Sequence, residues 1–179
     1  MKNSMMNQLN RSTYILLFVC SMGLFGLIAS CSTPSVTQAQ KNKEIVKKTF
    51  EIVGDGDYEG MNTYIADNYV RHCQATPDLV IETLDAFKEF IKADRKAIPD
   101  QKLLVKMLIA EGDLVAFWCT YTGTHTGQMG PFPPTGKTAN LDFSGVHRLE
   151  NGKVVETWVT WDNITILGQL GLYPPKTIE

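Results

Sequence analysis

The sequence predicts an α+β fold, in which helices near the N-terminus pack on one face of a curved antiparallel sheet. Segments with apolar residues at helical spacing come first in the chain, and longer segments typical of strands follow them. Asn151-Gly152 lies between two of these strand segments, and this dipeptide strongly indicates a β-hairpin. Because a curved sheet folded around a helix encloses space, we expect a cone-shaped cavity.

The first thirty residues are set apart from this fold. Lys2 and Arg11 precede an apolar run over residues 14–29, and small residues then lead to Cys31. This order is typical of a secretory signal, and Ile28-Ala29-Ser30-Cys31 resembles the lipidation motif of bacterial lipoproteins. The apolar run is shorter than the ~20 residues of a spanning helix. An N-terminal membrane anchor that is never cleaved is the alternative.

We therefore expect a lipoprotein signal peptide over residues 1–30, a flexible tether over 31–41 and one domain over 42–179. The tether is rich in Ser, Thr, Gln and Lys and has no apolar period. The domain is long enough for one two-layer core. Lipid on Cys31 would hold the protein in the bacterial cell envelope, on the periplasmic or extracellular side.

Composition and residue counts narrow the classes of partner that the protein could bind. The 179 residues carry a net charge of −2 without a basic stretch, so we expect no nucleic-acid partner. The three histidines are scattered over separate elements, so we expect no metal site. No nucleotide fingerprint appears, and we expect no cofactor. Cys73 and Cys119 could form a disulfide in an exported protein, but two separate buried thiols are favoured because their spacing follows no disulfide framework.

The elements follow in order along the domain. Apolar spacing predicts helices over residues 43–53, shortly after Asp57, and from Thr83 to a point before Pro99. Residues 69–73 predict a short strand between the second and third helices. Longer strands are expected over 102–110, 114–126, 138–149 and 153–161, and a last helix over 163–170.

The hairpin turn sets the expected register of its two strands. A two-residue turn pairs Leu149 with Val154, and an unbroken register then places His147 opposite Glu156. Because side chains alternate along a strand, one face of the hairpin should carry a common set of residues. These are Leu141, Phe143, Gly145, His147, Leu149, Val154, Glu156, Trp158, Thr160 and Asp162.

The preceding strand extends the same face. If Thr126 pairs with Thr138 across the proline-rich loop, the odd-numbered residues of this strand join the face that carries Asp162. Four of them, Phe117, Cys119, Tyr121 and His125, are candidate pocket residues together with Phe143 and Trp158. The opposite face would carry Trp118, Val146, Val155, Val159 and Trp161, and such an apolar outer face suggests a partner.

A series of short motifs has a recognisable order and spacing. They are Gly123-Thr124-His125-Thr126-Gly127, Gly130-Pro131, Pro133-Pro134-Thr135-Gly136-Lys137, the hairpin from Asn151 to Trp158, Asp162-Asn163 and Gln169-Leu170-Gly171. In this order they resemble the SnoaL-like polyketide cyclase family, the ester cyclases of the NTF2-like superfamily. The resemblance extends over roughly residues 41–175.

The resemblance implies an NTF2-like cone with a deep apolar pocket, and a homodimer that pairs sheet to sheet. Characterised cyclases of the family close a ring by intramolecular aldol condensation, without metal or cofactor. Their acid/base is an aspartate near the end of the last strand, which Asp162 matches. The segment around His72 matches the place of a polar pocket residue. Where relatives usually have Arg-Trp, this chain has Trp118-Cys119, and the smaller side chain of Cys119 would leave a roomier pocket if that position points inward.

Asp162 and His72 are therefore the candidate catalytic residues. Proton abstraction beside a carbonyl needs a base and a donor for the enolate oxygen, and a desolvated carboxylate is a stronger base than one in water. Each residue also has a structural alternative. Asp162 precedes a helix and could be its N-cap, and His72 could be a surface histidine.

The other two histidines have structural alternatives that are favoured. His125 could order the proline-rich loop rather than line the pocket. His147 would lie about 20 Å along the strand from Asp162, so a structural pair with Glu156 is expected.

Three functions fit these observations. The first is a cofactor-free isomerase or lyase that acts on a small apolar carbonyl compound, with Asp162 as its base. The second is a lipid-anchored protein that binds an apolar small molecule without chemistry. The third is an interaction module that uses its sheet face. The polar residues around Asp162 favour the first over the third, whereas the sequence does not separate the first from the second.

Overall fold

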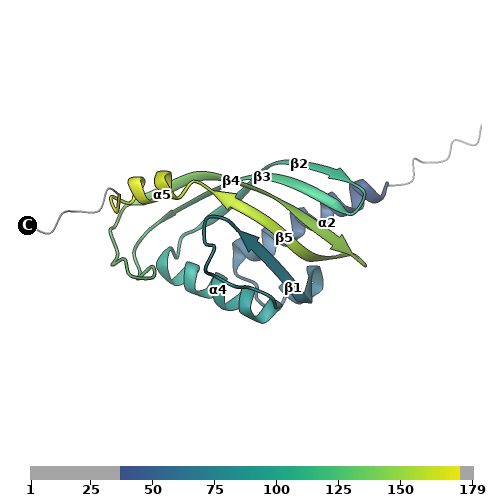
Figure 1. The fold of residues 1–179 in the computed structure, drawn as a ribbon, viewed down its shortest axis with the longest axis horizontal. Coiled ribbons are helices and arrows are strands. Elements are labelled where there is room, and N and C mark those ends of the chain that lie inside the picture. Colours follow the sequence, from purple (N-terminus) through teal and green to yellow (C-terminus); the bar gives the residue numbers. More distant parts are fainter. Residues whose placement is uncertain (1–36, 174–179) are drawn as a thin grey trace, which may run out of the picture. The chain divides into compact units, whose positions relative to one another are not determined.

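The computed structural model describes residues 37–173, and in this part of the chain the helices and strands follow the predicted order (Figure 1). The predicted signal peptide, the predicted lipidation site at Cys31 and most of the predicted tether lie outside the described residues. The helices are α2 (Gln38–Asp55), α3 (Met61–Tyr64), α4 (Leu84–Ala97) and α5 (Asn163–Gln169); the strands are β1 (Ile65–Cys73), β2 (Lys102–Glu111), β3 (Leu114–Thr124), β4 (Thr138–Glu150) and β5 (Lys153–Trp161).

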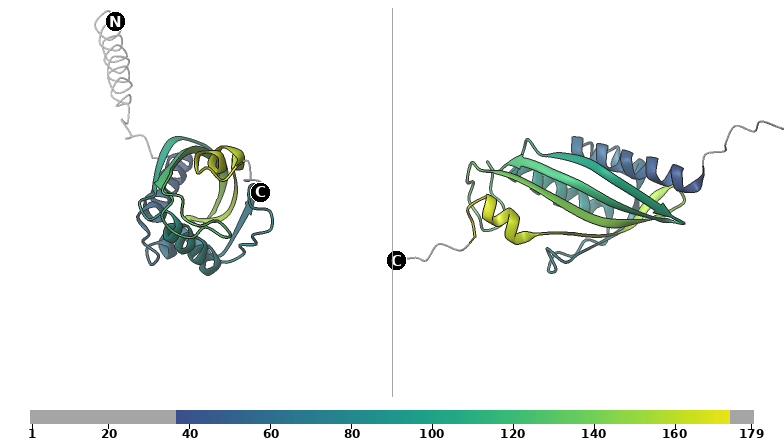
Figure 2. Two further views of the ribbon diagram at one scale, coloured as in Figure 1. Left: turned by 90° about the vertical axis from the view of Figure 1, so that its left-hand side faces the viewer. Right: turned by 90° about the horizontal axis from the view of Figure 1, so that it is seen from above.

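The strands form one curved sheet in the order β1-β5-β4-β3-β2. All neighbouring pairs are antiparallel except β1 and β5, which run parallel. The views in Figure 2 show the sheet curling around the helical side of the domain, with α2 and α4 against it. The predicted α+β class, with helices packed on a curved antiparallel sheet, is confirmed. In the range 37–173, no helix has both the length and the apolar character needed to cross a membrane.

Helix α2 begins five residues before the predicted start at Lys43. The Thr37 side chain accepts a hydrogen bond from the backbone N–H of Gln40 and caps the helix there. Residues 38–41, which we assigned to the tether, therefore form the first helical turn. Their polar side chains have no apolar period, so the capping threonine is the only local signal for this start.

The second and third elements also differ from the prediction. Helix α3 has only four residues, and β1 starts at Ile65, four residues before the predicted strand. Tyr69 and Arg71 are buried on the inner side of this strand, whereas His72 is exposed on the outer side. The pairing of Arg71 with Thr157 and of His72 with Trp158 fixes this orientation.

The hairpin contains a β-bulge that the sequence did not predict. The turn has the expected positive φ angles at Asn151 and Gly152, and the pairing of Leu149 with Val154 is confirmed. The next pair, however, is Arg148 with Glu156, so Val155 is an extra residue on β5. The predicted pairs beyond this point are wrong by one residue, and His147 faces Thr157 instead of Glu156.

The bulge reverses the orientation of the rest of β5. Because side chains alternate along a strand, one extra residue moves every later side chain to the opposite face. Val159 and Trp161 therefore face inward, and Trp158 faces outward with 41% of its surface exposed. The register between β3 and β4 differs from the predicted one by two residues, which leaves the orientation of Tyr121 unchanged.

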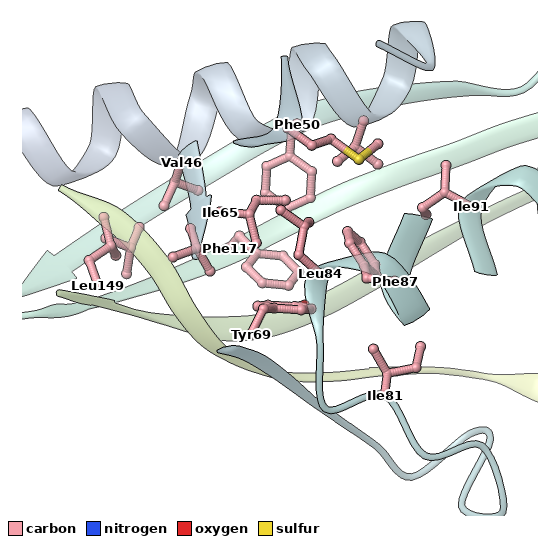
Figure 3. Packing of buried hydrophobic residues seen from close by; sticks show 14 of the residues in the cluster. Val46, Phe50, Ile65, Tyr69, Ile81, Leu84, Phe87, Ile91, Phe117 and Leu149 are labelled. Carbon is pink, nitrogen blue, oxygen red and sulfur yellow. The ribbon is translucent and has the colours of Figure 1, made fainter. Parts of the chain in front are cut away.

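The main hydrophobic core joins the two long helices to the sheet (Figure 3). Val46 and Phe50 come from α2, and Phe87 comes from α4. They pack with Phe117 of β3 and Tyr69 of β1, and the rings of Phe50 and Phe117 meet edge to face at 5.0 Å between centroids. Several of these residues also form the wall of a cavity, so the core positions the candidate site.

Candidate functional site

A cavity of about 180 Å³ lies between the inner face of the sheet and helices α2, α4 and α5. This volume is more than ten times the ~10–15 Å³ that one water needs on a comparable measure, so a small organic molecule can fit. Most of the wall is apolar, and a few polar side chains interrupt it. The polar members are Tyr69, Arg71, Asp94, Gln101, Tyr121, His147 and Thr157.

Asp94 and Tyr121 form a hydrogen-bonded pair in this cavity. The Tyr121 hydroxyl of β3 donates to Oδ2 of Asp94 on α4, at 3.3 Å. Burial raises the pKa of the Asp94 carboxyl to about 6, although the hydrogen bond from Tyr121 and the positive charges of Arg95 and Arg71 act in the opposite direction. The pKa of Tyr121 is also raised, mainly by burial and then by the neighbouring carboxylate. Tyr121 therefore remains protonated and can keep donating this bond.

Helix geometry brings Asp94 to the cavity. Phe87 and Ile91 are buried on the inner face of α4, and Asp94 follows them at the i+7 and i+3 positions on that face. The half-buried carboxylate thus lies on the cavity wall, where it is largely desolvated. A carboxyl group with a pKa near neutrality is suited to take up and return a proton.

Arg71 lines the same cavity from β1 and is only 7% exposed. Its guanidinium carbon lies 4.7 Å from the ring centre of Phe90 and 5.6 Å from that of Trp161. Its buried Nη1 has no hydrogen-bond partner among the described residues. A buried, permanently charged side chain therefore faces the cavity beside two aromatic rings.

His147 is neutral in this environment. Its Nδ1 lies 2.7 Å from Oγ1 of Thr157, and burial lowers the pKa of its ring to about 3. Its Nε2 is buried without a partner among the residues described. The predicted pair between His147 and Glu156 is wrong, because the bulge places Thr157 opposite His147.

The structure brings only some of the predicted pocket residues to the cavity. Phe117, Tyr121 and Phe143 lie on its wall. Cys119 is fully buried on the same side of β3, but it belongs to the core rather than to the wall, and burial raises the pKa of its thiol to about 12. Cys119 and Cys73 are both free thiols. The structure therefore fits the favoured prediction of two separate thiols rather than a disulfide, although Cys73 is only half-buried.

Asp162 does not line the cavity, and its predicted place at the pocket mouth is wrong. The bulge at Val155 turns it to the outer face, where it is exposed. Its carboxylate caps α5 by accepting hydrogen bonds from the backbone N–H groups of Ile164 and Thr165 and from the Thr165 hydroxyl. These bonds hold the pKa of Asp162 below its ordinary value, mainly through the Thr165 hydroxyl, as expected for a cap.

His72 and Trp158 also lie on the outer face, so their predicted positions in the pocket are wrong. His72 Nε2 lies 2.8 Å from Oε1 of Glu156, and its ring stacks on Trp158 at 5.3 Å between centroids. The alternation of β1 turns Arg71 inward and His72 outward, and the bulge on β5 turns Trp158 to the same outer side.

His125 is fully buried, but it lies outside the cavity wall. Strand β3 ends at Thr124, so the register that placed His125 in the pocket does not extend to it. Its Nδ1 lies 3.2 Å from the Thr135 hydroxyl, and its backbone carbonyl accepts from Thr135 and Gly136. These contacts fit the favoured alternative, in which His125 orders the proline-rich loop.

The sequence analysis did not identify Asp94 and Arg71 as site residues, although the sequence contains an indication for each. Asp94 is a charged residue in line with the apolar face of a predicted helix. Arg71 has the same strand parity as the buried Tyr69, two residues earlier. Within residues 37–173, no three His, Cys, Asp or Glu side chains are grouped so that they could hold a metal ion.

The outer face of the sheet is apolar, but its composition differs from the prediction. Val159 and Trp161 line the cavity instead, and Val155 is buried at the bulge. Ile109, Val146 and Trp158 lie in one row across the sheet, connected through Ala116. Exposed apolar side chains around this row are Leu104, Met107, Ile109, Trp118 and Trp158.

Residues 43–170 match the model of the family described as SnoaL-like polyketide cyclase. A comparison with curated proteins found no significant match. Among solved structures, a proposed polyketide cyclase from Acidithiobacillus ferrooxidans is 30% identical to this chain, with a TM-score of 0.66; the alignment covers 75% of this chain and 97% of that one.

Two further solved structures have the same fold. IdmH from Streptomyces antibioticus, a proposed polyketide cyclase, is 28% identical with a TM-score of 0.65, over 73% of this chain and 99% of IdmH. AclR from Streptomyces galilaeus, a proposed hydroxylase, is 27% identical with a TM-score of 0.66, over 77% of this chain and 85% of AclR. Proteins similar to this chain are thus described with more than one reaction.

Proposed function

The chain belongs to the SnoaL-like polyketide cyclase family, and from that premise we propose that it is a cofactor-free acid/base catalyst acting on a small apolar carbonyl compound. The observation that carries the proposal is the Asp94 carboxyl, which lies in an apolar cavity with its pKa raised to about 6. The reaction would be an isomerisation or an aldol-type ring closure. Both begin with removal of a proton from a carbon next to a carbonyl.

Asp94 is the proposed base. Its carboxylate takes a proton from the α-carbon of the substrate, the C–H electron pair moves into the enolate, and the same carboxyl group later returns the proton. Near pH 7 most of a group with a pKa of about 6 is ionised, yet it is a stronger base than an ordinary aspartate. The hydrogen bond from Tyr121 orients the carboxylate toward the cavity.

The desolvated wall supports the same chemistry. Phe117, Phe143 and Trp161 contribute aromatic surface that can hold an apolar substrate against α4. In a cavity with few polar groups, interactions with a developing negative charge are stronger than in water. The polar groups that face the cavity are therefore the candidates for contact with the enolate oxygen.

Deuterium exchange into 2-tetralone, an apolar ketone with acidic α-protons, tests this reaction without requiring the natural substrate. NMR in D2O follows the loss of the α-proton signals in the presence of the protein. Asp94→Asn keeps the size of the side chain but removes the base, so catalysed exchange should fall by the ~10² to 10⁴ of a lost general base. Asp162→Asn is the matched control, because Asp162 lies on the outer face, and it should keep exchange within about threefold of the unsubstituted protein.

Two results would contradict the assignment. Unchanged exchange in Asp94→Asn would exclude Asp94 as the base, and a large loss in Asp162→Asn would return that role to Asp162. Both variants should be compared at equal folded fraction, measured by circular dichroism.

The second candidate function is binding of an apolar small molecule without chemistry. The largely apolar wall of the cavity favours it, since such a surface retains apolar ligands whether or not a base is present. Native mass spectrometry of the purified protein would detect a retained ligand. If that ligand leaves unchanged after incubation, and 2-tetralone does not exchange, the binding function is supported over the reaction.

We further propose that lipid on Cys31 anchors the protein in the bacterial cell envelope, on the basis of the apolar run and Ile28-Ala29-Ser30-Cys31. Cys31→Ala should release the protein from the membrane fraction. Unchanged fractionation together with an intact Met1 would overturn this proposal.

A homodimer through the outer sheet face is the proposed assembly. The exposed apolar side chains around Ile109 and Trp118 support it, because monomeric proteins rarely expose contiguous patches of this kind. Ile109→Lys should weaken the dimer in sedimentation analysis. Ile164→Lys, at an exposed apolar residue of α5 and off the sheet, is the control. A monomer at all concentrations for the unsubstituted protein would exclude this assembly.

A further inference from the structure

Arg71 has no structural role that explains its charge. It is 7% exposed, and none of the side-chain hydrogen bonds or ion pairs formed within residues 37–173 involves its guanidinium group; Nη1 is fully buried without a partner. A buried charge without a partner is strongly destabilising, and arginine cannot escape that cost by losing its proton. The protein therefore keeps an unpaired cation on the wall of the apolar cavity.

The aromatic neighbours compensate this cost only in part. Phe90 and Trp161 lie 4.7 and 5.6 Å from the guanidinium carbon, within the range of cation–π attraction. Contacts with ring faces hold the guanidinium plane in place, but they do not satisfy N–H donors that lie in that plane. The other guanidinium nitrogens also form no hydrogen bond within residues 37–173, and unlike Nη1 they are not fully covered by protein atoms, so their donors remain available to a group in the cavity.

We propose that Arg71 is an anion-recognition residue and that the natural ligand of the cavity is an apolar organic acid whose carboxylate pairs with its guanidinium. The inference rests on the proposed function, to which it adds the class of substrate. A planar carboxylate matches the fork of N–H donors and can accept two parallel hydrogen bonds from it. The rings of Phe90 and Trp161 would lie beside the apolar body of the same ligand.

The surroundings favour a monoanion over a phosphate ester. Asp94 lines the same cavity without forming an ion pair with Arg71, and its own hydrogen-bond partner is Tyr121. Arg71 is the one lysine or arginine among the residues that line the cavity. One cation balances one carboxylate, whereas the second charge of a phosphate would remain uncompensated close to the Asp94 carboxyl.

Calorimetric titration with 1-naphthoate and 1-naphthaldehyde tests the proposal. The two probes share a ring system and differ in charge. The unsubstituted protein should bind naphthoate at least about tenfold more tightly than the aldehyde. Arg71→Met removes the charge at similar length, so affinity for naphthoate should fall roughly 10²-fold while affinity for the aldehyde changes little. Arg71→Lys, which keeps the charge but not the fork, should be intermediate.

Arg148→Met is the matched control, because Arg148 is a half-buried arginine that already pairs with Glu156 at 3.0 Å, away from the cavity. It should leave the affinity for both probes unchanged. Arg71→Met should also raise the melting temperature, since it removes an unpaired buried charge. A purely structural role for Arg71 predicts a lower melting temperature and an equal effect on both probes.

The inference is overturned if Arg71→Met binds naphthoate within about threefold of the unsubstituted protein, or if the unsubstituted protein binds the aldehyde as tightly as the acid. The second comparison needs no variant, so it decides the question even if Arg71→Met does not fold. Because 2-tetralone carries no carboxylate, its exchange tests the reaction at Asp94 alone. Either experiment can fail while the other succeeds.

Discussion

The hydroxyl of Tyr121 and the carboxylate of Asp94 meet at 3.3 Å in an otherwise largely apolar cavity. Tyr121 comes from β3 of the sheet and Asp94 from helix α4, so their contact requires the tertiary fold. The contact combines a desolvated carboxyl with a donor that remains protonated. Local sequence does not indicate this pair, because 26 residues lie between its members.

Asp94→Asn should stabilise the protein in a pH-dependent way. The folded-state pKa of about 6 lies above the ordinary value of 3.8, so Asp94 binds its proton more tightly in the folded protein. The contribution of the protonated group is complete below about pH 3.8 and is lost as pH rises through 6. Above pH 6 the variant should be more stable by about 3 kcal/mol, from roughly two pKa units. Urea denaturation at several pH values measures this difference.

The comparison of two proteins isolates Asp94 from other titrating groups. His147 also influences stability between pH 3 and 6.5, in the opposite direction, but it does so in both proteins and cancels in the difference. The gain in Asp94→Asn should be near zero at pH 3.5 and constant above pH 7. A gain that does not change with pH would show that the pKa of Asp94 is not raised.

Tyr121→Phe should move the pH dependence of the proposed reaction. The hydrogen bond from Tyr121 lowers the pKa of Asp94 against the larger effect of burial, so its removal should raise that pKa further. The acidic limb of the rate of 2-tetralone exchange should shift to higher pH by about one unit, with the plateau reached later. A lower plateau without any shift of the limb would instead show that Tyr121 acts on the substrate.

Asp162→Ala should loosen α5 without reaching the cavity chemistry. The carboxylate accepts from the backbone N–H groups of Ile164 and Thr165, and alanine offers these donors no acceptor. Hydrogen exchange at both amides should become several-fold faster, whereas Asp162→Asn, which keeps a capping side chain, should stay close to the unsubstituted protein. Unchanged exchange in the alanine variant would show that the cap does not protect this helix.

Trp161 and Trp158 should differ in their effect on ligand binding, although both are on β5. Trp161 lines the cavity and Trp158 is exposed on the outer face. Trp161→Leu should weaken binding of 1-naphthaldehyde by roughly 2- to 10-fold through lost aromatic contact. Trp158→Leu should leave that affinity unchanged in the same calorimetric titration. The reverse result would mean that β5 follows the unbroken register in solution.

The fold could be predicted from sequence because its signals are local. Helical spacing indicated α4, and Asn151-Gly152 fixed the turn and its adjacent pair, Leu149 with Val154. Each of these depends on residues a few positions apart. The error in the register between β3 and β4 was an even number of residues, so the side chains of Tyr121 and Phe143 kept their predicted orientation.

The site was harder to predict because its position depends on an irregularity. Valine is a common strand residue, so nothing in Val154-Val155 marks a bulge. The position of Val155 as an extra residue nevertheless decides which face of the sheet carries Asp162. Asp94 and Arg71 meet the cavity through tertiary packing between α4 and β1. The face on which each residue lies could be read from its own helix or strand. That both side chains face the same cavity depends on how α4 and β1 pack together.

Val155 lets β5 carry one more residue than its ladder uses. Removal of this residue would leave the pairs on either side of it, Leu149 with Val154 and Arg148 with Glu156, in regular alternation, so every later side chain would keep its present face. A straightened strand that retained Val155 in the ladder would instead exchange the later inward and outward side chains. Trp158 and Asp162 would then enter the interior as Val159 and Trp161 left it. The cavity wall on β5 thus tolerates loss of Val155 but not its incorporation into the pairing with β4.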